Sequence, residues 1–314
     1  MRSKHYVVAC LAGGGIGPEL MAEASRAVAE VSRQHSFHVE ELHVPFGGEA
    51  VARHGHPLPA ATRAAYRRAD AIPVAATREP ALDGVKADLD LTWRIMRVDS
   101  TPAGDLAVVS PLVDDAAAYA VERGFQLARA RRAQVASVAE SAAWRGLVTE
   151  ATERHPGVLV EELSLAQALP LLVSEPRRFC VLVAEPQFAE ALSDMAAFGR
   201  NGSRTVASGR LSPQGPGLFG PTHGSAPDIA GQGVANPSGM LLAAALMLGE
   251  GLGERAAAKT LERAVSAAIA AGVRTADLVE GGVGATTRSF MDTVLELLPR
   301  ARTDTEFFVE AAGA

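Results

Sequence analysis

Lysine is scarce in this chain of 314 residues. Lys4, Lys86 and Lys259 are its three lysines, so the long segment between Lys86 and Lys259 has no lysine that could act as a general base. Tyrosine is also rare, and none follows Tyr119. Between residues 120 and 258, proton transfer therefore has to use other residue types.

Cysteine and long apolar runs are scarce too. Cys10 and Cys180 each lie inside an apolar, strand-like run, which favours inert core thiols in a reducing compartment over a disulfide. No segment reaches the roughly 18 apolar residues that a membrane helix needs. The run VVACLA (7–12) is too short for a signal peptide. We therefore expect a cytoplasmic protein without a membrane partner.

Excess positive charge is absent as well. The formal net charge is −6, which argues against nucleic acid as a partner, because such binding needs clustered positive charge. The one basic run, RARRAQ (129–134), is interpreted as the solvated end of a helix. A small molecule is the expected ligand.

What is present is a regular alternation of strands and helices. Hydrophobic residues make up 48% of the chain, and its length favours two domains. The pattern predicts an α/β architecture with a largely parallel sheet. The main predicted strands are 6–12, 38–46, 71–76, 106–110, 134–139, 158–163 and 179–184. The main predicted helices are 18–34, 60–70, 114–133, 142–155, 165–173, 188–198, 238–252 and 256–272.

Several segments taken together carry a family resemblance. They are GGGIGPEL (13–20), RRAQVASVAES (131–141), EPRRFCVLVAEPQFAEALSDMAAF (175–198), HGSAPDIAGQGVANPSGM (223–240) and GGVGATTRSFMDTVLELL (281–298). The chain resembles the β-decarboxylating dehydrogenases, the family of isocitrate and 3-isopropylmalate dehydrogenase, and the isopropylmalate branch more closely. The resemblance implies a two-domain fold with an interdomain cleft, a first domain of 1–99 plus 205–314, a second domain of 100–204, and a homodimer whose sites borrow residues from the partner subunit.

The loop HGSAPDIAGQGVANP (223–237) offers backbone N–H groups, a carboxylate at Asp228 for ribose hydroxyls and an amide at Asn236 for an adenine edge. A carboxylate at this place would repel the 2′-phosphate of NADP and favour NAD. The alternative is an inherited turn that packs but no longer binds. The resemblance implies that NAD contacts His223, Gly224, Ala226, Asp228, Ile229 and Asn236.

The resemblance also shows which catalytic groups are missing. The position of the family's lysine base holds Glu140, and the segment that supplies a substrate arginine and a catalytic tyrosine is absent between Pro102 and Asp114. Glu190 and Asp194 keep two carboxylates on one helix face, where they could hold Mg²⁺ or Mn²⁺, while the third metal position is Ala166. A solvated helix face explains that pair equally well. Glu140 and Asp194 are the candidate catalytic residues.

The substrate side is altered in the same way. Lys86 stands at the first substrate-arginine position and Met96 at the second, with Arg94 and Arg97 as candidate replacements or, alternatively, plain surface charges. Three interpretations remain open. The protein is an NAD-binding enzyme acting on a small hydroxy or keto acid with altered chemistry, a non-redox enzyme using the same cleft, or a non-catalytic pseudoenzyme.

Overall fold

The computed structural model describes residues 4–75, 80–98, 105–201, 206–279 and 283–299. The predicted domain boundaries, at 99/100 and at 204/205, lie outside these residues. Within the described residues, no helix is both long enough and apolar enough to cross a membrane.

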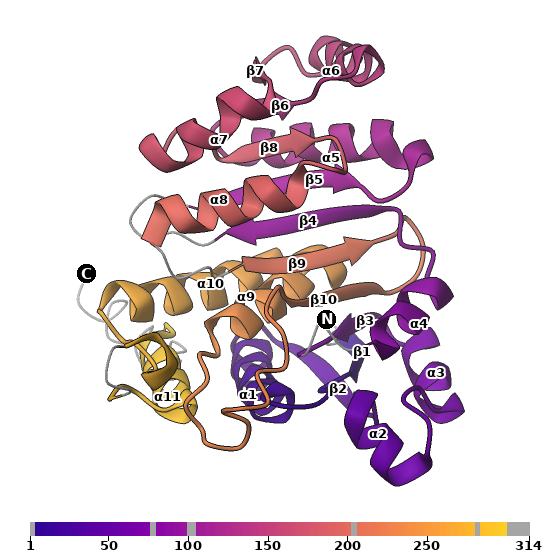
Figure 1. Ribbon diagram of the computed structural model, residues 1–314, viewed down its shortest axis with the longest axis vertical. Coiled ribbons are helices and arrows are strands. Elements are labelled where there is room, and N and C mark those ends of the chain that lie inside the picture. Colours follow the sequence, from indigo (N-terminus) through magenta and orange to yellow (C-terminus); the bar gives the residue numbers. More distant parts are fainter. Residues whose placement is uncertain (1–3, 76–79, 99–104, 202–205, 280–282, 300–314) are drawn as a thin grey trace, which may run out of the picture.

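One ten-stranded sheet runs the length of the molecule, in the order β2-β1-β3-β10-β9-β4-β5-β8-β6-β7 (Figure 1). Both outer parts are parallel, and the central strands β10, β9, β4 and β5 pair antiparallel. The predicted α/β class is confirmed. The strands are β1 Lys4–Cys10, β2 Phe37–His43, β3 Ala71–Pro73, β4 Trp93–Val98, β5 Leu106–Pro111, β6 Gln134–Val138, β7 Leu159–Leu163, β8 Val181–Ala184, β9 Val206–Leu211 and β10 Gly217–Pro221.

The helices follow the predicted order. They are α1 Gly17–Gln34, α2 Gly47–His54, α3 Ala60–Arg67, α4 Ala81–Asp88, η1 Asp114–Ala116, α5 Ala117–Arg129, α6 Ala142–Arg154, α7 Leu165–Ser174, α8 Ala189–Asn201, α9 Ser238–Leu246, η2 Met247–Gly251, α10 Arg255–Ala270, η3 Ala276–Leu278 and α11 Thr287–Leu297. Side-chain caps fix several starts, such as Ser141 before α6 and Ser164 before α7.

The α-helix in the segment 114–133 is shorter than the sequence pattern predicts. It begins as the 3₁₀ turn η1 and ends at Arg129, and Ala133 then adopts a left-handed conformation with φ +54°. The run 129–134 is also less exposed than predicted. Arg131 is 16% exposed and pairs with Asp105 at 2.9 Å, so the interpretation of the whole run as a solvated helix end is wrong for this residue.

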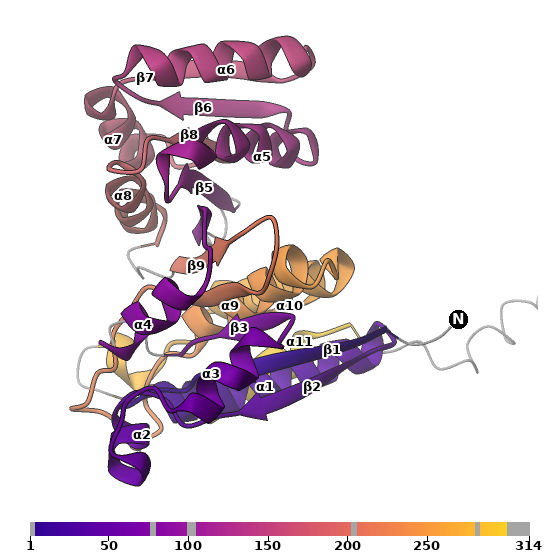
Figure 2. The same ribbon diagram turned by 90° about the vertical axis from the view of Figure 1, so that its right-hand side faces the viewer.

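Helices cover both faces of the sheet (Figure 2). We call the side that carries α4 and α8 the front face, and the side that carries α5, α9 and α10 the back face. Arg94 and Arg97 on β4 show the division directly, because residues three apart on a strand point to opposite faces. Arg94 pairs with Glu190 of α8, whereas Arg97 pairs with Glu262 of α10.

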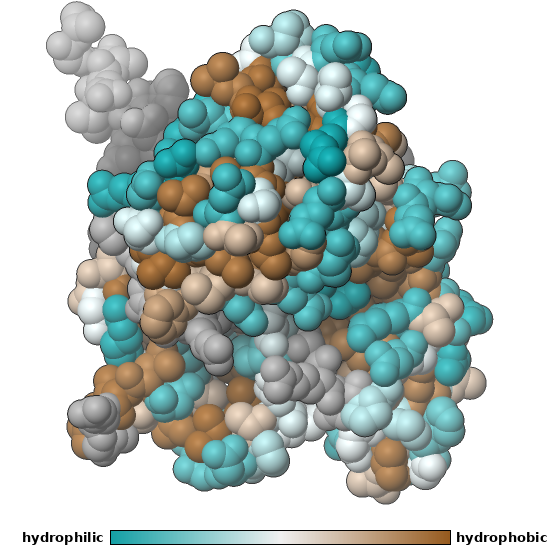
Figure 3. Space-filling view, turned by 45° about the horizontal axis from the view of Figure 1, so that its top comes forward, coloured by the Kyte–Doolittle hydropathy of each residue, from teal (hydrophilic) through white to brown (hydrophobic). Residues whose placement is uncertain are grey.

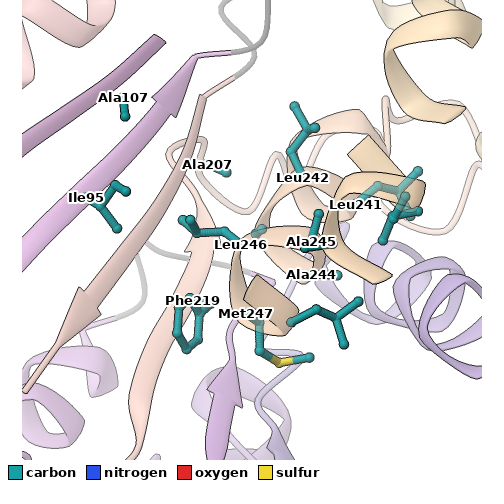
Figure 4. Packing of buried hydrophobic residues seen from close by; sticks show 14 of the residues in the cluster. Ile95, Ala107, Ala207, Phe219, Leu241, Leu242, Ala244, Ala245, Leu246 and Met247 are labelled. Atoms are coloured by element: carbon teal, nitrogen blue, oxygen red, sulfur yellow. The ribbon is translucent and has the colours of Figure 1, made fainter. Parts of the chain in front are cut away.

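The largest apolar core lies on the back face. Every residue of α9 is buried, as expected for a helix that is apolar on all sides. Its side chains pack against Ile95, Ala207 and Phe219 of the central strands (Figure 4). A second core, built from residues 96–206, lies under α7 and α8 on the front face. The division into two domains stays a prediction, because the sheet is continuous and the back-face core spans both halves.

Both cysteines are buried and free, as predicted. Burial raises the pKa of the Cys10 thiol strongly, and the nearby Glu41 carboxylate adds to the effect. This thiol is therefore unreactive at neutral pH.

Candidate functional site: a cationic cavity beside a glycine-rich loop

A cavity of about 280 Å³ opens on the front face between α4, α8 and the central strands. Its floor comes from β4, β9 and β10. Thr222, which directly follows β10, also lines the cavity and is adjacent in sequence to the 223–237 loop. The polar residues lining it are Lys86, Arg94, Glu190, Ser193, Asp194, Ser208, Arg210 and Thr222.

Arg94 and Arg210 form the floor of this cavity. They lie directly opposite each other on the antiparallel strands β4 and β9, so their side chains share one face of the sheet. Burial lowers the pKa of Arg210, and the positive charge of Arg94 lowers it further. Two guanidinium groups held this close favour a negatively charged ligand between them.

Arg94 is the better neutralised of the two. Its side chain is 7% exposed, and Nη1 lies 2.7 Å from Oε1 of Glu190, whose own side chain is 74% exposed. Its Nε donates to Oγ of Ser110 at 3.4 Å. Lys86 contributes a third cation, paired at 2.9 Å with the exposed Asp83 at the rim. The cavity therefore gathers more positive charge than its two lining carboxylates, Glu190 and Asp194, can balance.

The predicted substrate residues are only partly brought together. Lys86 and Arg94 meet in the cavity, as do the predicted metal residues Glu190 and Asp194. Arg97 does not join them. It points to the back face, where it pairs with Asp105 at 2.6 Å and with Glu262 at 3.0 Å.

Glu140 lies away from the cavity of its own chain. It is exposed, in the turn that follows β6, and it is not among the residues that line the cavity. Glu185 fixes this turn by accepting hydrogen bonds from the backbone N–H groups of Glu140 at 3.0 Å and Ser141 at 3.3 Å. Burial alone would raise the pKa of Glu185, but these hydrogen bonds outweigh it and lower the pKa.

The carboxylates of one chain do not match the three-carboxylate metal site that the resemblance implies. Glu190 is already paired with a guanidinium, Asp194 is exposed, and Ala166 on α7 offers no ligand atom. Among the described residues, one group has three converging metal-ligand side chains, Cys10, Glu41 and His43. It lies on β1 and β2 at one end of the sheet, whereas α8 packs on β4 and β5 near the middle. A divalent cation at Glu190 and Asp194 would need ligands from elsewhere.

The 223–237 loop is held against the turn after β1. Ile16 N–H donates to the carbonyl of Ser225 at 2.8 Å, and Gly233 N–H donates to Oε2 of Glu19 at 3.1 Å. Gly15 has φ +62°, and a methyl group added there would overlap the carbonyl oxygen of Ser225. Gly15 therefore shapes this junction.

The predicted nucleotide contacts occupy distinct positions on this loop. His223 donates from Nδ1 to the carbonyl of Gly224 at 3.0 Å, and burial lowers its pKa, although that hydrogen bond opposes the shift. Asn236 is oriented by two contacts, its Oδ1 accepting from Ser238 N–H at 2.8 Å and its own N–H donating to Asp277 at 3.0 Å. Its amide NH₂ is the donor that could read a base edge.

Gly224, Ala226 and Ile229 lie in the same loop, and Ala226 has an unusual φ of +35°. The Asp228 side chain is exposed, while its carbonyl accepts from Nε2 of Gln232 at 2.8 Å. The loop thus presents a histidine with a lowered pKa, an amide oriented through its oxygen and an exposed carboxylate, which together offer hydrogen-bond donors and acceptors to a ligand.

Sequence reasoning missed two residues, Arg210 in the cavity and Glu185 at the turn that holds Glu140. Arg210 could have been found from the strand VASGRL, in which Ser208 and Arg210 are two apart and so share a face. Glu185 had no comparable signal. Its role depends on the pairing of β8 with β6, which brings the end of β8 beside the turn at Glu140.

Comparison with known proteins places these features in a family. A family model described as isocitrate/isopropylmalate dehydrogenase matches residues 7–93 and 98–294. The 3-isopropylmalate dehydrogenase of Synechococcus sp. (strain CC9605) is 35% identical over 340 aligned positions, covering 89% of this chain and 95% of the relative. The 3-isopropylmalate dehydrogenase of Pseudoalteromonas translucida is 33% identical, covering 88% of this chain and 95% of the relative.

Solved structures agree with this result. A β-decarboxylating dehydrogenase from Thermococcus kodakarensis has a TM-score of 0.78 at 25% identity, covering 93% of this chain and 96% of that one. An isocitrate dehydrogenase from Methylococcus capsulatus has a TM-score of 0.75 at 25% identity, covering 93% and 99%. The 340 positions aligned with the Synechococcus enzyme exceed the 314 residues of this chain, so that relative carries residues that this chain lacks. The chain belongs to the isocitrate/isopropylmalate dehydrogenase family.

Proposed function

We propose that this protein binds NAD at the 223–237 loop and a small hydroxy or keto acid in the front cavity, with chemistry altered from that of the family. The observation that carries the proposal is the facing pair Arg94 and Arg210 in a cavity that adjoins the loop. Guanidinium groups bind carboxylates strongly, and Lys86 adds a third positive charge at the rim.

NAD is preferred over NADP in this proposal. The Asp228 carboxylate is exposed and suited to accept hydrogen bonds from two ribose hydroxyls, whereas it would repel a 2′-phosphate. His223 and Asn236 would contact the adenine side of the dinucleotide. Bound NAD would supply a hydride acceptor next to the cavity.

The residues of this chain would bind and orient the acid. Arg210 and Lys86 would hold its carboxylate groups, and the Ser208 hydroxyl lies beside them in the lining. Asp194 is the lining carboxylate outside the Arg94–Glu190 pair, so it is the group that would accept a proton from a substrate hydroxyl, directly or through one water. Glu140 could take part only if a second subunit brings it to the cavity.

The lysine base and the catalytic tyrosine that the resemblance implies are missing from this chain. Without them, the oxidation and decarboxylation that the resemblance implies would lack the usual base and acid. The Arg94–Glu190 ion pair supports a second candidate, a non-catalytic protein, because it ties up one of the two carboxylates of the cavity. A non-redox enzyme using the same cavity remains the other alternative.

We also propose a homodimer working in the cytoplasm. α7 and α8 pack side by side and expose apolar side chains at Val173 and Phe198. Figure 3 shows apolar surface among hydrophilic surface on the half of the molecule that carries these helices. A second copy covering this face would bury them.

Calorimetric titration tests the proposal. We expect NAD to bind and NADP to bind markedly more weakly, and Asp228→Asn to reduce this difference. With NAD present, 3-isopropylmalate should bind, and Arg210→Gln should weaken its binding. Arg68→Gln should leave it unchanged, because Arg68 is an exposed arginine directly after α3 and outside the cavity lining. NADH formation should be absent or slowed about 10²- to 10⁴-fold, as expected for a lost general base. Equal affinity for both dinucleotides, or turnover at an ordinary rate, would overturn the proposal.

A further inference from the structure

A second and larger cavity, of about 780 Å³, lies on the back face between α5 and α10, with α9 at its base. It shares no lining residue with the front cavity, and the sheet separates the two. Its volume is within the range of small-molecule sites, roughly 300–1,000 Å³. Of the residues predicted from the sequence to bind NAD or substrate, Arg97 alone lines it, and the proposed function gives Arg97 no role.

The acidic residues of this cavity are already neutralised. Asp105 pairs with Arg97 at 2.6 Å and with Arg131 at 2.9 Å. Glu262 pairs with Arg97 at 3.0 Å, and Glu250 pairs with Arg123 at 2.9 Å. Three arginines thus face three carboxylates in the inner part of the cavity, so among the described residues no acid there is left to balance further positive charge.

Three more cations line the outer part. Arg255, Lys259 and Arg263 follow one another at a spacing of four on α10, which puts them on one side of the helix. All three are exposed, and no ion pair joins them to an acid among the described residues. Like charges at this spacing destabilise a helix slightly, so a bound anion would relieve their repulsion.

The base of the cavity is apolar. Leu242, Ala245 and Leu246 of α9 face it, as does Leu127 of α5 (Figure 4 labels the three α9 residues). A ligand that matches both parts needs an apolar body and a negatively charged end. A simple inorganic anion would leave the apolar base unused.

We propose that this back cavity binds an organic anion, an apolar group carrying a phosphate or carboxylate end, with the charged end against Arg255, Lys259 and Arg263. The apolar group lies against α9 and Leu127. Because α5 and α10 come from the two halves of the sheet, the ligand contacts both.

Hexyl phosphate is a suitable probe, and Trp93 provides a local signal. The Arg123 guanidinium lines the cavity one helical turn from Leu127 and stacks 5.5 Å from the centre of the Trp93 ring, so an apolar group lying against Leu127 alters the environment of this tryptophan through Arg123. The chain has two tryptophans, and Trp144→Phe leaves Trp93 as the one emitter. We expect hexyl phosphate to bind by calorimetry and to change Trp93 fluorescence, with inorganic phosphate and hexanol each binding more weakly.

Charge variants locate the site. Lys259→Glu and Arg263→Gln should each weaken hexyl phosphate binding about three- to tenfold, as expected for loss of an exposed charge contact. Arg129→Gln is the matched control, because Arg129 is an exposed cation of α5 outside the cavity lining. Arg210→Gln tests whether the probe binds in the front cavity instead. No binding, equal losses in the Arg129 variant, or a loss in the Arg210 variant alone would overturn the proposal.

Discussion

Gly15 is the residue on which the junction between the first turn and the 223–237 loop depends. Its φ of +62° is unfavourable for alanine by about 1 to 2 kcal/mol. A methyl group would also overlap the Ser225 carbonyl. We expect Gly15→Ala to lower the free energy of unfolding by more than this conformational term and to weaken NAD binding, as measured by urea denaturation and calorimetry.

Gly253 provides the control for this substitution. It has a similar φ of +73°, but an added Cβ would meet no atom within 4 Å. Gly253→Ala should therefore show the conformational term alone and leave NAD affinity unchanged. Equal effects of the two substitutions on stability and affinity would show that Gly15 does not position the loop.

His223 gives the protein a pH-dependent term in its stability. Burial lowers the folded-state pKa of His223 below the ordinary value of 6.5, so the unfolded chain binds a proton that the folded chain rejects. The contribution of neutral His223 is complete above pH 6.5 and is lost as the pH falls toward the lowered folded-state pKa. Unfolding curves at pH 7.5 and pH 5 should therefore differ more in the parent protein than in His223→Asn. An unchanged pH dependence in the variant would contradict this assignment.

At the scale of elements, α5 packs closely on β8 through a glycine. A Cβ added at Gly124 would overlap Cγ1 of Val183, so Gly124→Ala should push the helix away from the sheet. We expect it to lower the free energy of unfolding by about 1 to 3 kcal/mol, the usual effect of overpacking. Urea denaturation measures the change.

Gly146 on α6 is the matched helical glycine, because an added Cβ would meet nothing within 4 Å. Gly146→Ala should raise the free energy of unfolding by about 0.5 to 1 kcal/mol through helix propensity alone. If both substitutions stabilise the protein, α5 and β8 leave room for a methyl group between Gly124 and Val183, and the proposed overlap is wrong.

The elements themselves could be predicted from the sequence because each carries its own period. Apolar spacing identified helices such as α6 and α8, and short apolar runs identified strands such as β5 and β8. The direction of single side chains was harder to predict. Arg94 and Arg97 looked equivalent as adjacent cations, and only the strand conformation of Trp93–Val98 sends them to opposite faces.

At the scale of the whole molecule, the candidate site combines residues far apart in the sequence. Arg94 and Arg210 become neighbours through the antiparallel pairing of β4 with β9, which no local pattern predicts. The loop 223–237 was readable from its own residues, because its glycines and Asp228 form a continuous motif. Glu140 stands at the position of the family's lysine base, yet within one chain it lies outside the cavity.

The association of two chains is therefore the property that decides whether Glu140 can reach a cavity. Phe198 on α8 is 62% exposed, and Val173 on the adjacent α7 is also exposed. We expect the parent protein to be a dimer by light scattering. Phe198→Glu should shift it toward the monomer, because burying an unpaired carboxylate at an apolar interface is unfavourable by several kcal/mol. Val51→Glu, at an exposed apolar position on α2, should remain dimeric. A monomeric parent protein at micromolar concentration, or a Phe198 variant that stays dimeric, would place the contact elsewhere and remove Glu140 from the proposed site.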